Sequence, residues 1–173
     1  VLSGTNAGIS VNDGTVNTIL YNTSSTNGSL GTTTNHPMAF YTNNAERMRI
    51  DSAGIVTTPF QPSFIAKGLV GQTIYTAGQV VVFNSSSTNV GGHYNTTNGQ
   101  FTAPVAGTYL FTFLVYLNGG TTNSPLAYYK NGVMEIFHLQ SVAMSGIGLA
   151  TTIYLAASDY VDVRVRAGTG GTA

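Results

Sequence analysis

The sequence predicts an all-β protein that is built from two β modules. Short apolar runs alternate with Asn-Gly and Asp-Gly dipeptides along the 173 residues, a pattern typical of strands joined by tight turns. Aromatic residues recur at every second position in the run 108–117, as they do on one face of a strand. Pro59 and Pro62 interrupt the chain between the two modules, because proline cannot donate to a central β ladder. We therefore expect an N-terminal β module over residues 1–60 and an antiparallel sandwich or jelly roll over residues 61–173.

The composition excludes several classes of function. Charged residues make up 7% of the chain, against about 25% in an ordinary soluble domain. The six basic and six acidic residues cancel, so no basic field is available to hold a phosphate backbone, and nucleic-acid binding is not expected. Without cysteine the chain can form neither disulfides nor thiolate metal sites. A surface rich in Asn, Thr, Ser and Gly is common in extracellular β fibres.

Neither a membrane-spanning helix nor a signal peptide is expected within these 173 residues. No apolar stretch approaches the roughly 20 residues that a membrane-spanning helix needs. The first residues, Val1-Leu-Ser-Gly, match neither an initiator methionine nor a signal peptide. We expect the sequence to be a piece of a longer polypeptide.

The first module has too little apolar material for a core of its own. Sixty residues with few large apolar side chains bury too small a fraction of their surface to be stable alone. We therefore expect this module to be a stalk in which copies of the chain intertwine and cover one another's strands. The strands are predicted at 9–11, 16–21, 38–42 and 47–56, with turns at Asp13-Gly14 and Asn27-Gly28.

The second module reads as a series of strands with tight turns between them. Asn98-Gly99, Asn118-Gly119 and Asn131-Gly132 supply residues that tolerate the positive φ angles of such turns. The strands are predicted at 80–83, 99–103, 108–117, 126–129, 133–139, 148–156 and 160–166.

The strand at 108–117 is apolar on both of its faces. Alternation places Tyr109, Phe111 and Phe113 on one face, and Leu110, Leu114 and Tyr116 on the other. A strand without a polar face is buried on both sides. One side can face the core of a sandwich, and a neighbouring copy of the chain is the expected cover for the other.

An ordered set of motifs in the second module points to a known family. In chain order they are Val80-Val-Val-Phe83, Tyr94-Asn95 with Gly99-x-Phe101, Pro104-x-x-Gly-x-Tyr-x-Phe-x-Phe113, Lys130-Asn131-Gly132, and Leu155 through Asp159-Tyr-Val-Asp-Val163. This set resembles the C1q-like domain, the trimeric jelly roll shared with tumour-necrosis-factor-like ligands. The resemblance covers about 105 residues and implies a homotrimer.

Two departures from that family stand out. Ser158 occupies the position of the usual glycine before the aspartate. The family closes with a strand of the type Ser-x-Phe-x-Gly-x-Leu, whereas this sequence ends with Gly-Thr-Gly-Gly-Thr-Ala at 168–173. We expect the head to lack its last strand here, either because the polypeptide continues or because the sheet is completed differently. We favour the alternative in which the polypeptide continues, since an unfilled strand position beside the first strand of the head would leave a long exposed sheet edge.

The first module resembles a different group of proteins. The runs Asn35-His-Pro-Met-Ala-Phe-Tyr-Thr-Asn-Asn44 and Glu46-Arg-Met-Arg-Ile-Asp-Ser-Ala-Gly-Ile-Val56 are similar to repeats in the distal parts of phage tail fibres. Joined to a C1q-like tip, this resemblance implies a trimeric fibre with a stalk and a head.

No pattern of catalytic or metal-binding residues is present in the sequence. His36, His93 and His138 are scattered and lie in no recognisable nucleophile or zinc pattern. Asp159 and Asp162 are three apart in a predicted strand, so they point to opposite faces and cannot act as a pair. We expect no catalytic residue, no metal site and no cofactor, and hence no enzyme.

Two sets of residues are candidates for packing and for binding. We assign to core or trimer packing Phe83, Phe101, Tyr109, Phe111, Phe113, Leu114, Val161 and Val163. Exposed tyrosine beside asparagine suits stacking on sugar rings, although packing in an interface is the alternative. The candidate receptor contacts are Tyr94, Asn95, Tyr128 and Tyr129, and the candidate receptor loops are 84–98, 118–125 and 140–147.

These expectations combine into a structural virion fibre protein, located extracellularly on the virion. Its expected partners are two further copies of the chain, other virion proteins and a host cell-surface glycan or protein receptor. Two alternatives remain open, a secreted or spore-surface C1q-like trimeric ligand and a purely architectural virion component.

Overall fold

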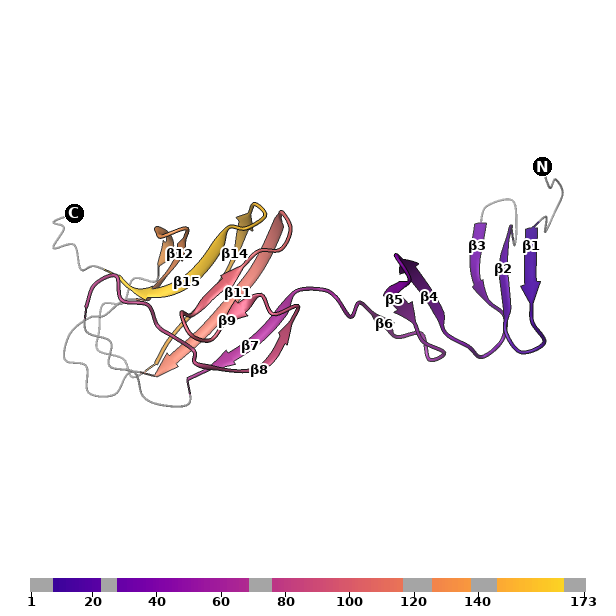
Figure 1. The fold of residues 1–173 in the computed structure, drawn as a ribbon, viewed down its shortest axis with the longest axis horizontal. Coiled ribbons are helices and arrows are strands. Elements are labelled where there is room, and N and C mark those ends of the chain that lie inside the picture. The colour runs from indigo at the N-terminus through magenta and orange to yellow at the C-terminus, as the bar shows by residue number, and fades with distance from the viewer. Residues whose placement is uncertain (1–7, 23–27, 69–75, 117–125, 138–145, 167–173) are drawn as a thin grey trace. The chain divides into compact units, whose positions relative to one another are not determined.

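The computed structural model describes residues 8–22, 28–68, 76–116, 126–137 and 146–166, and all regular secondary structure in these ranges is β strand (Figure 1). The chain divides into two compact units, Val1–Gln61 and Pro62–Ala173. Every pair of neighbouring strands in these ranges is antiparallel, both in hairpins such as β1–β2 and between strands distant in sequence such as β11 and β14.

The N-terminal unit contains two three-stranded sheets. The first has the order β1-β2-β3 and the second the order β4-β5-β6. Their bounds are β1 Gly8–Asn12, β2 Asn17–Asn22, β3 Gly28–Thr32, β4 Met38–Thr42, β5 Ala45–Ile50 and β6 Val56–Thr57.

Local turn chemistry sets the second of these sheets. Asn43 and Asn44 both have positive φ, 50° and 55°, which is the backbone of a two-residue hairpin turn between β4 and β5. The Asp51 carboxylate accepts hydrogen bonds from the backbone amides of Ala53 at 2.9 Å and Ile55 at 2.8 Å. This turn divides the single strand that we predicted at 47–56 into β5 and β6, because the aspartate side chain competes for the amides that a continuous strand would use.

The C-terminal unit contains a five-stranded sheet and two two-stranded sheets. The five-stranded sheet has the order β13-β12-β15-β10-β9, and the others are β7-β8 and β11-β14. Their bounds are β7 Ser63–Lys67, β8 Ser85–Val90, β9 Tyr94–Asn95, β10 Gln100–Thr102, β11 Gly107–Tyr116, β12 Leu126–Lys130, β13 Val133–Phe137, β14 Gly146–Leu155 and β15 Tyr160–Val165.

The early strand predicted at 80–83 is not a regular strand. Val80 forms an isolated bridge with Arg164, and the Val81 amide donates to the Val163 carbonyl at 2.8 Å, so this segment follows one edge of β15. The prediction missed β3, β7, β8 and β9, the last two of which lie in the predicted receptor loop 84–98. β8 is the run Ser-Ser-Ser-Thr-Asn-Val, whose polar composition resembles that of a loop, and its strand character comes from pairing with β7.

The core lies between the five-stranded sheet and the inner face of β11–β14, with β7 at its margin. Phe101 on β10 has its ring 5.3 Å from Phe64, 5.3 Å from Tyr109 and 5.5 Å from Phe111 between ring centroids. These separations are those of favourable offset and edge-to-face aromatic contacts. The aromatic alternation along β11 therefore builds the centre of the sandwich, as the sequence predicted.

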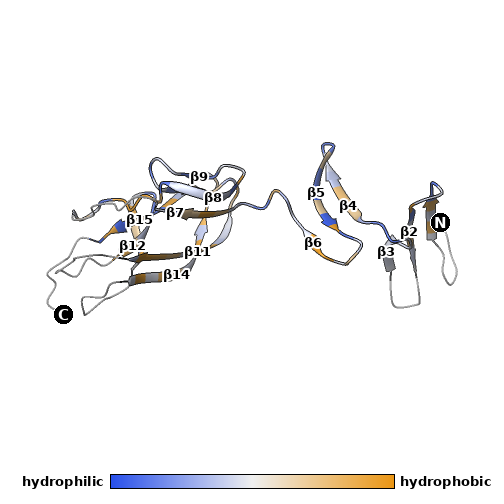
Figure 2. Cartoon of the chain, turned by 90° about the horizontal axis from the view of Figure 1, so that it is seen from below, coloured by the Kyte–Doolittle hydropathy of each residue, from blue (hydrophilic) through white to orange (hydrophobic). Residues whose placement is uncertain are grey.

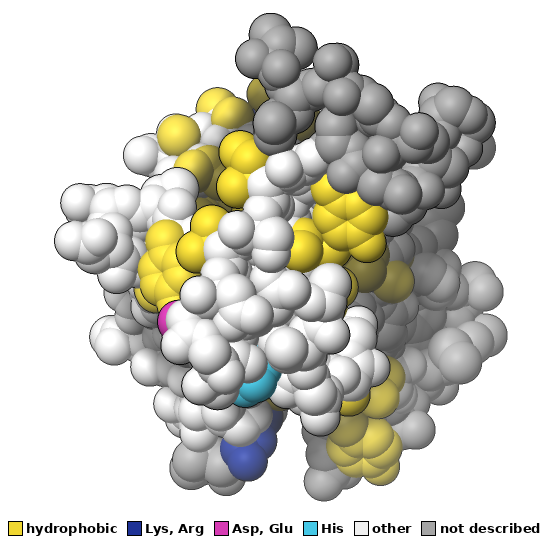
Figure 3. Space-filling view, turned by 90° about the vertical axis from the view of Figure 1, so that its right-hand side faces the viewer, with side chains coloured by type: hydrophobic (Ala, Val, Ile, Leu, Met, Phe, Trp, Pro, Cys, Tyr) yellow, Lys and Arg dark blue, Asp and Glu magenta, His cyan; other side chains and the backbone are white. Residues whose placement is uncertain are grey.

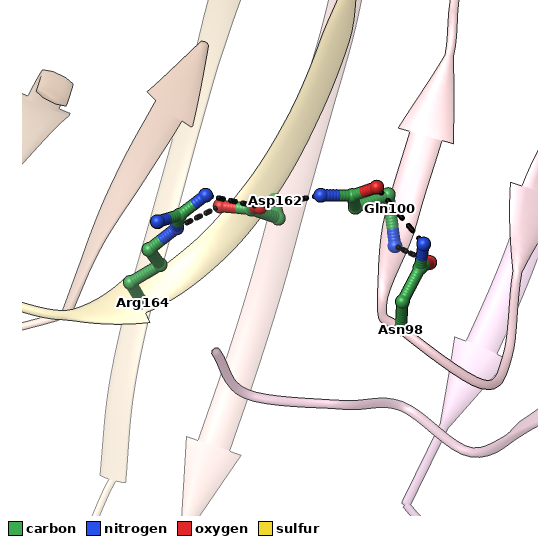
Figure 4. A network of polar contacts seen from close by, with 4 residues as sticks. All are labelled: Asn98, Gln100, Asp162 and Arg164. Atoms are coloured by element: carbon green, nitrogen blue, oxygen red, sulfur yellow. Dashed lines mark hydrogen bonds and ion pairs between the residues drawn. The ribbon is translucent and has the colours of Figure 1, made fainter. Parts of the chain in front are cut away.

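Charged side chains are sparse on the surface, and Figure 3 shows them on the face drawn there as isolated spots among uncharged groups. Asp162 on β15 is an exception to the usual exposure of charge, because its side chain is fully buried. Its carboxylate accepts two hydrogen bonds from the Arg164 guanidinium, at 2.7 and 2.8 Å, and one from the Gln100 amide at 3.2 Å (Figure 4). Asn98 in turn bonds to Gln100, so the network ties β10 and its preceding turn to β15.

Replacement of Asp162 tests the contribution of this network. Asp162→Ala should lower the free energy of unfolding by about 1.5–3 kcal/mol, the range for hydrogen bonds to charged groups, because Arg164 and Gln100 lose their shared acceptor. Urea denaturation at a fixed protein concentration measures the change. Glu135→Ala on exposed β13 removes the same charge and should change the free energy little. Equal effects of the two variants would contradict a structural role for the network.

Candidate functional site

The outer face of β11–β14 is an uncharged surface with several large, exposed apolar side chains. We define it as the side chains that point away from the core, namely Thr108, Leu110, Thr112, Leu114 and Tyr116 on β11 and Gly146, Gly148, Ala150, Thr152 and Tyr154 on β14. Within a single chain Leu110 is 74% exposed, Leu114 78% and Tyr116 72%. The predicted division of β11 into two apolar faces is thus confirmed, with one face in the core and the other open.

Small residues on β14 shape this outer face. Leu114 is paired directly with Gly148, and a β carbon built on that glycine would lie 3.5 Å from the Leu114 side chain. The Leu114 side chain therefore packs over Gly148. It projects from the outer face because its neighbours on β14, namely Gly146, Gly148 and Ala150, have no side chain or a small one. None of the side chains of the outer face is charged, so another protein surface can bury them without desolvating an ion.

A groove of about 500 Å³ opens between β7 and β11. One wall is formed by residues 62–66 and the other by residues 109–114. The aromatic rings in its lining come from Phe64, Phe83, Tyr94, Phe101, Tyr109, Phe111, Phe113 and Tyr128. The Phe64 and Tyr94 rings stack at 4.6 Å with an angle of 9° between their planes, which fixes β7 against the five-stranded sheet.

The groove lies beside β7, whereas the unfilled strand position was expected beside the strand predicted at 80–83. Among the described residues, β7 is bonded to β8 alone and β11 to β14 alone, so each strand has one open edge. The absence of a closing strand stays a prediction, because residues 167–173 lie outside the described part of the chain.

The predicted packing residues occupy three kinds of environment. Phe101, Phe111, Phe113, Val161 and Val163 are buried in the core. Phe83 and Tyr109 are half-buried at its margin, and Tyr109 donates a hydrogen bond to the Val105 carbonyl at 2.7 Å. Leu114 belongs to the open outer face.

Two of the four predicted receptor contacts are wrong. Tyr94 is 5% exposed and Tyr128 is 2% exposed, so both rings belong to the core and are inaccessible to a receptor. Their hydroxyls donate to the backbone carbonyls of Phe83 and Leu149, each at 3.2 Å. The sequence suggested exposure because both tyrosines lie next to turn residues, whereas the strand pairing of β9 and β12 points them inward.

The other two predicted contacts remain accessible. Asn95 is exposed, and its side-chain oxygen accepts a hydrogen bond from the Thr97 amide at 2.8 Å. Tyr129 is half-buried, and the Arg164 guanidinium lies 5.0 Å from the centre of its ring, within the range of a cation–π contact. Two of the predicted receptor loops, 118–125 and most of 140–147, lie outside the described residues.

The two aspartates of the C-terminal unit serve separate structural contacts. The Asp159 carboxylate accepts hydrogen bonds from Asn131 at 2.7 Å and from the Ala156 amide at 2.8 Å, and Lys130 lies 3.2 Å away. These contacts lower the pKa of Asp159, the Asn131 bond most of all. They connect the turn between β12 and β13 with the turn before β15, while Asp162 faces Arg164 on its own strand.

Within the described ranges, no three His, Asp or Glu side chains come close enough together to hold a metal ion. His36 contacts Thr34 at 3.1 Å, and the His93 ring lies edge-on to Phe101 with centroids 6.5 Å apart. His138 lies outside the described residues. The same part of the chain contains no helix that is long and apolar enough to cross a membrane.

Comparison with known protein families accounts for this arrangement. The family model described as C1q domain matches residues 63–171. The chain belongs to the C1q domain family. The match begins at the first residue of β7 and covers every strand of the C-terminal unit, so the five-stranded sheet, β7–β8 and β11–β14 together are its C1q domain. C1q domains generally form homotrimers, which gives the open outer face a natural partner in further copies of the chain.

The buried tyrosines of the C1q domain predict a loss of stability in alkali. Burial raises the pKa of Tyr94 to about 12 and also raises that of Tyr128 above its usual value. In the unfolded chain both ionise near the ordinary value of 10.0. Because the unfolded state loses its protons first, their contribution to stability is complete below pH 10 and declines as the pH rises toward 12.

Urea denaturation at about pH 9 and about pH 11 measures this decline through the change in unfolding free energy. Tyr94→Phe should reduce the difference between the two conditions, because phenylalanine has no proton to lose. A variant with the same alkaline loss as the unaltered protein would show that Tyr94 does not contribute to it.

Proposed function

We propose that this protein is a homotrimeric structural fibre protein of a virion, with its C1q domain as an attachment head for a host cell-surface glycan or protein receptor. The observation that carries the proposal is the uncharged, exposed outer face of β11–β14 in a domain of a generally homotrimeric family. Two further copies of the chain cover this face in the proposed assembly, and an interface of this kind buries on the order of 2,000 Å² or more.

The virion context is supported by the first module. Its runs 35–44 and 46–56 resemble phage tail-fibre repeats, and they form the β4–β5 hairpin and β6. In this proposal the other virion proteins join the fibre on the side of the N-terminal unit, and the molecule works outside the cell without a cofactor or a catalytic step.

The surface chemistry favours a neutral ligand such as a glycan. With six basic and six acidic residues in the whole chain, recognition relies on uncharged hydrogen-bonding groups and on aromatic stacking. Asn95 and Tyr129 supply such groups on the described surface. Three weak sites on one trimer strengthen one another when the receptor repeats at a matching spacing.

Two alternatives differ from the proposal in context and in binding. A secreted or spore-surface C1q-like ligand would share the trimer but not the virion partners. A purely architectural virion component would share the trimer and the virion location but would bind no receptor.

The assembly part of the proposal predicts the effect of a charge on the outer face. Leu114→Asp should give a folded monomer, because a carboxylate cannot be buried in an apolar interface without a partner, and Leu114 contributes nothing to the core of a single chain. Light scattering measures the mass in solution, and circular dichroism checks the fold. Val133→Asp, a similar change at a 70% exposed position of β13, is the matched control and should remain trimeric. A trimeric Leu114→Asp protein would place the interface elsewhere.

The attachment part of the proposal predicts a dependence on valency. The trimer should bind a surface coated with host glycans or with intact host cells, and the monomeric Leu114→Asp protein should bind about 100-fold more weakly, the lower end of the gain expected from multivalency. Surface plasmon resonance measures both. If a trimer of verified mass binds neither surface, the architectural alternative replaces attachment.

A further inference from the structure

The first sheet of the N-terminal unit presents a continuous apolar row across its three strands. Ile9 on β1 is paired with Leu20 on β2, and Leu20 is paired with Leu30 on β3. Directly paired residues point to the same side of a sheet, so these three side chains stand next to one another. In a single chain they are 57%, 55% and 54% exposed.

The same side of the sheet continues with a second row. Val11 lies two residues after Ile9 and is 65% exposed, and it is paired with Thr18, which is paired with Thr32. We call the two rows the apolar face of β1–β3. It bears no charged side chain. The opposite side includes Ser10, whose hydroxyl donates to the Asn17 side chain at 2.6 Å, and the half-buried Ile19 and Tyr21.

The second sheet of this unit is apolar on one side in the same way. Met38 is paired with Ile50, Phe40 with Met48, and Ile50 with Val56, so these five side chains share one side, where Phe40 is 38% and Val56 57% exposed. Figure 2 marks hydrophobic positions along β4 and β6.

A β-bulge places the Glu46 carboxylate on the side opposite to these apolar residues. The register shifts between Phe40 and Tyr41, so that Tyr41 is paired with Glu46. Glu46 therefore lies on the side opposite to Phe40, where it forms an ion pair with Arg49 at 2.5 Å. Arg49 lies on the side of Glu46 as well, whereas the Arg47 guanidinium at the bulge donates a hydrogen bond to the Thr42 hydroxyl at 2.8 Å.

We infer that the apolar face of β1–β3 is a self-association surface, on which three copies of the chain bring Ile9, Leu20 and Leu30 together around a common axis. The apolar face of a sheet has to be buried against another layer, and among the described residues β1, β2 and β3 form a sheet of their own. This inference rests on the proposed homotrimer and names the surface by which the N-terminal unit takes part in it.

Further copies of the chain are favoured over a different protein as the occupant. The C1q domain is covalently joined to this unit, so a trimeric head holds three identical sheets at high effective concentration. A self-contact needs a surface without net charge, since identical charges would meet and repel each other, and the apolar face of β1–β3 has none.

Disulfide trapping in the full chain tests the inference. The sequence has no cysteine, so Leu20→Cys and Ser10→Cys each introduce a single thiol on opposite sides of the same sheet. Under mild oxidation Leu20→Cys should link chains in pairs, because thiols near a common axis come within disulfide distance. Ser10→Cys, which faces away, should link several-fold less. Non-reducing gel electrophoresis measures the linked fraction.

A second pair of variants checks the same face without a cross-link. Leu20→Asp should leave the full chain trimeric through its head but make the N-terminal unit sensitive to limited proteolysis, whereas Ser10→Asp should leave it protected. Light scattering on both variants shows whether the full chain is still a trimer. It thereby distinguishes loss of the whole trimer from loss of the contact in the N-terminal unit alone. A monomeric unaltered protein would overturn the homotrimer and this inference together.

Other outcomes overturn the inference alone. A trimer in which Leu20→Cys links no better than Ser10→Cys, or in which Leu20→Asp stays protected, shows that other copies do not cover this face. A Leu20→Cys/Phe40→Cys protein that forms an internal disulfide within one chain shows that the second sheet of the same chain covers it instead.

Discussion

The structure depends on one constraint, which is that β11 carries large apolar side chains on both of its faces. A strand of this kind is stable between two layers, and a single chain supplies one of them. The five-stranded sheet covers Phe111 and Phe113, whereas Leu110 and Leu114 remain open. Packing of the inner face of β11 against the five-stranded sheet stabilises the fold of a single C1q domain. Burial of the outer face would favour association with another copy of the chain.

The same arrangement recurs in the N-terminal unit with smaller parts. Each of its two sheets is a single layer that exposes large apolar residues, and neither has a helix or a second sheet hydrogen-bonded to it among the described residues. The bulge between β4 and β5 interrupts the regular pairing. As a result, Glu46 lies beside Arg49 and on the side opposite to Phe40. An apolar sheet side of this kind is stable when another layer buries it.

The sequence allowed correct prediction of the features that depend on alternation and on turn chemistry. The two faces of β11 and the Asn131-Gly132 hairpin, in which both residues have positive φ, follow from local rules. β8 was missed because Ser85 to Asn89 have no intrinsic strand preference, and their pairing with β7 is a long-range effect. Tyr94 and Tyr128 were misplaced for a related reason, since the burial of a tyrosine depends on which sheet neighbour its strand acquires. The groove between β7 and β11 is formed by strands distant in sequence and could not be read from either one.

The scarcity of charge on the outer face of β11–β14 has a consequence for the environments in which the protein can work. Attraction between ions weakens as dissolved salt shortens the distance over which charges interact, from about 30 Å in dilute solution to about 3 Å in strong brine. Contacts made through Leu110, Leu114 and Tyr116 contain no such attraction to lose. In the proposed trimer, association through this face should therefore depend little on ionic strength, and salts that are excluded from protein surfaces should strengthen it.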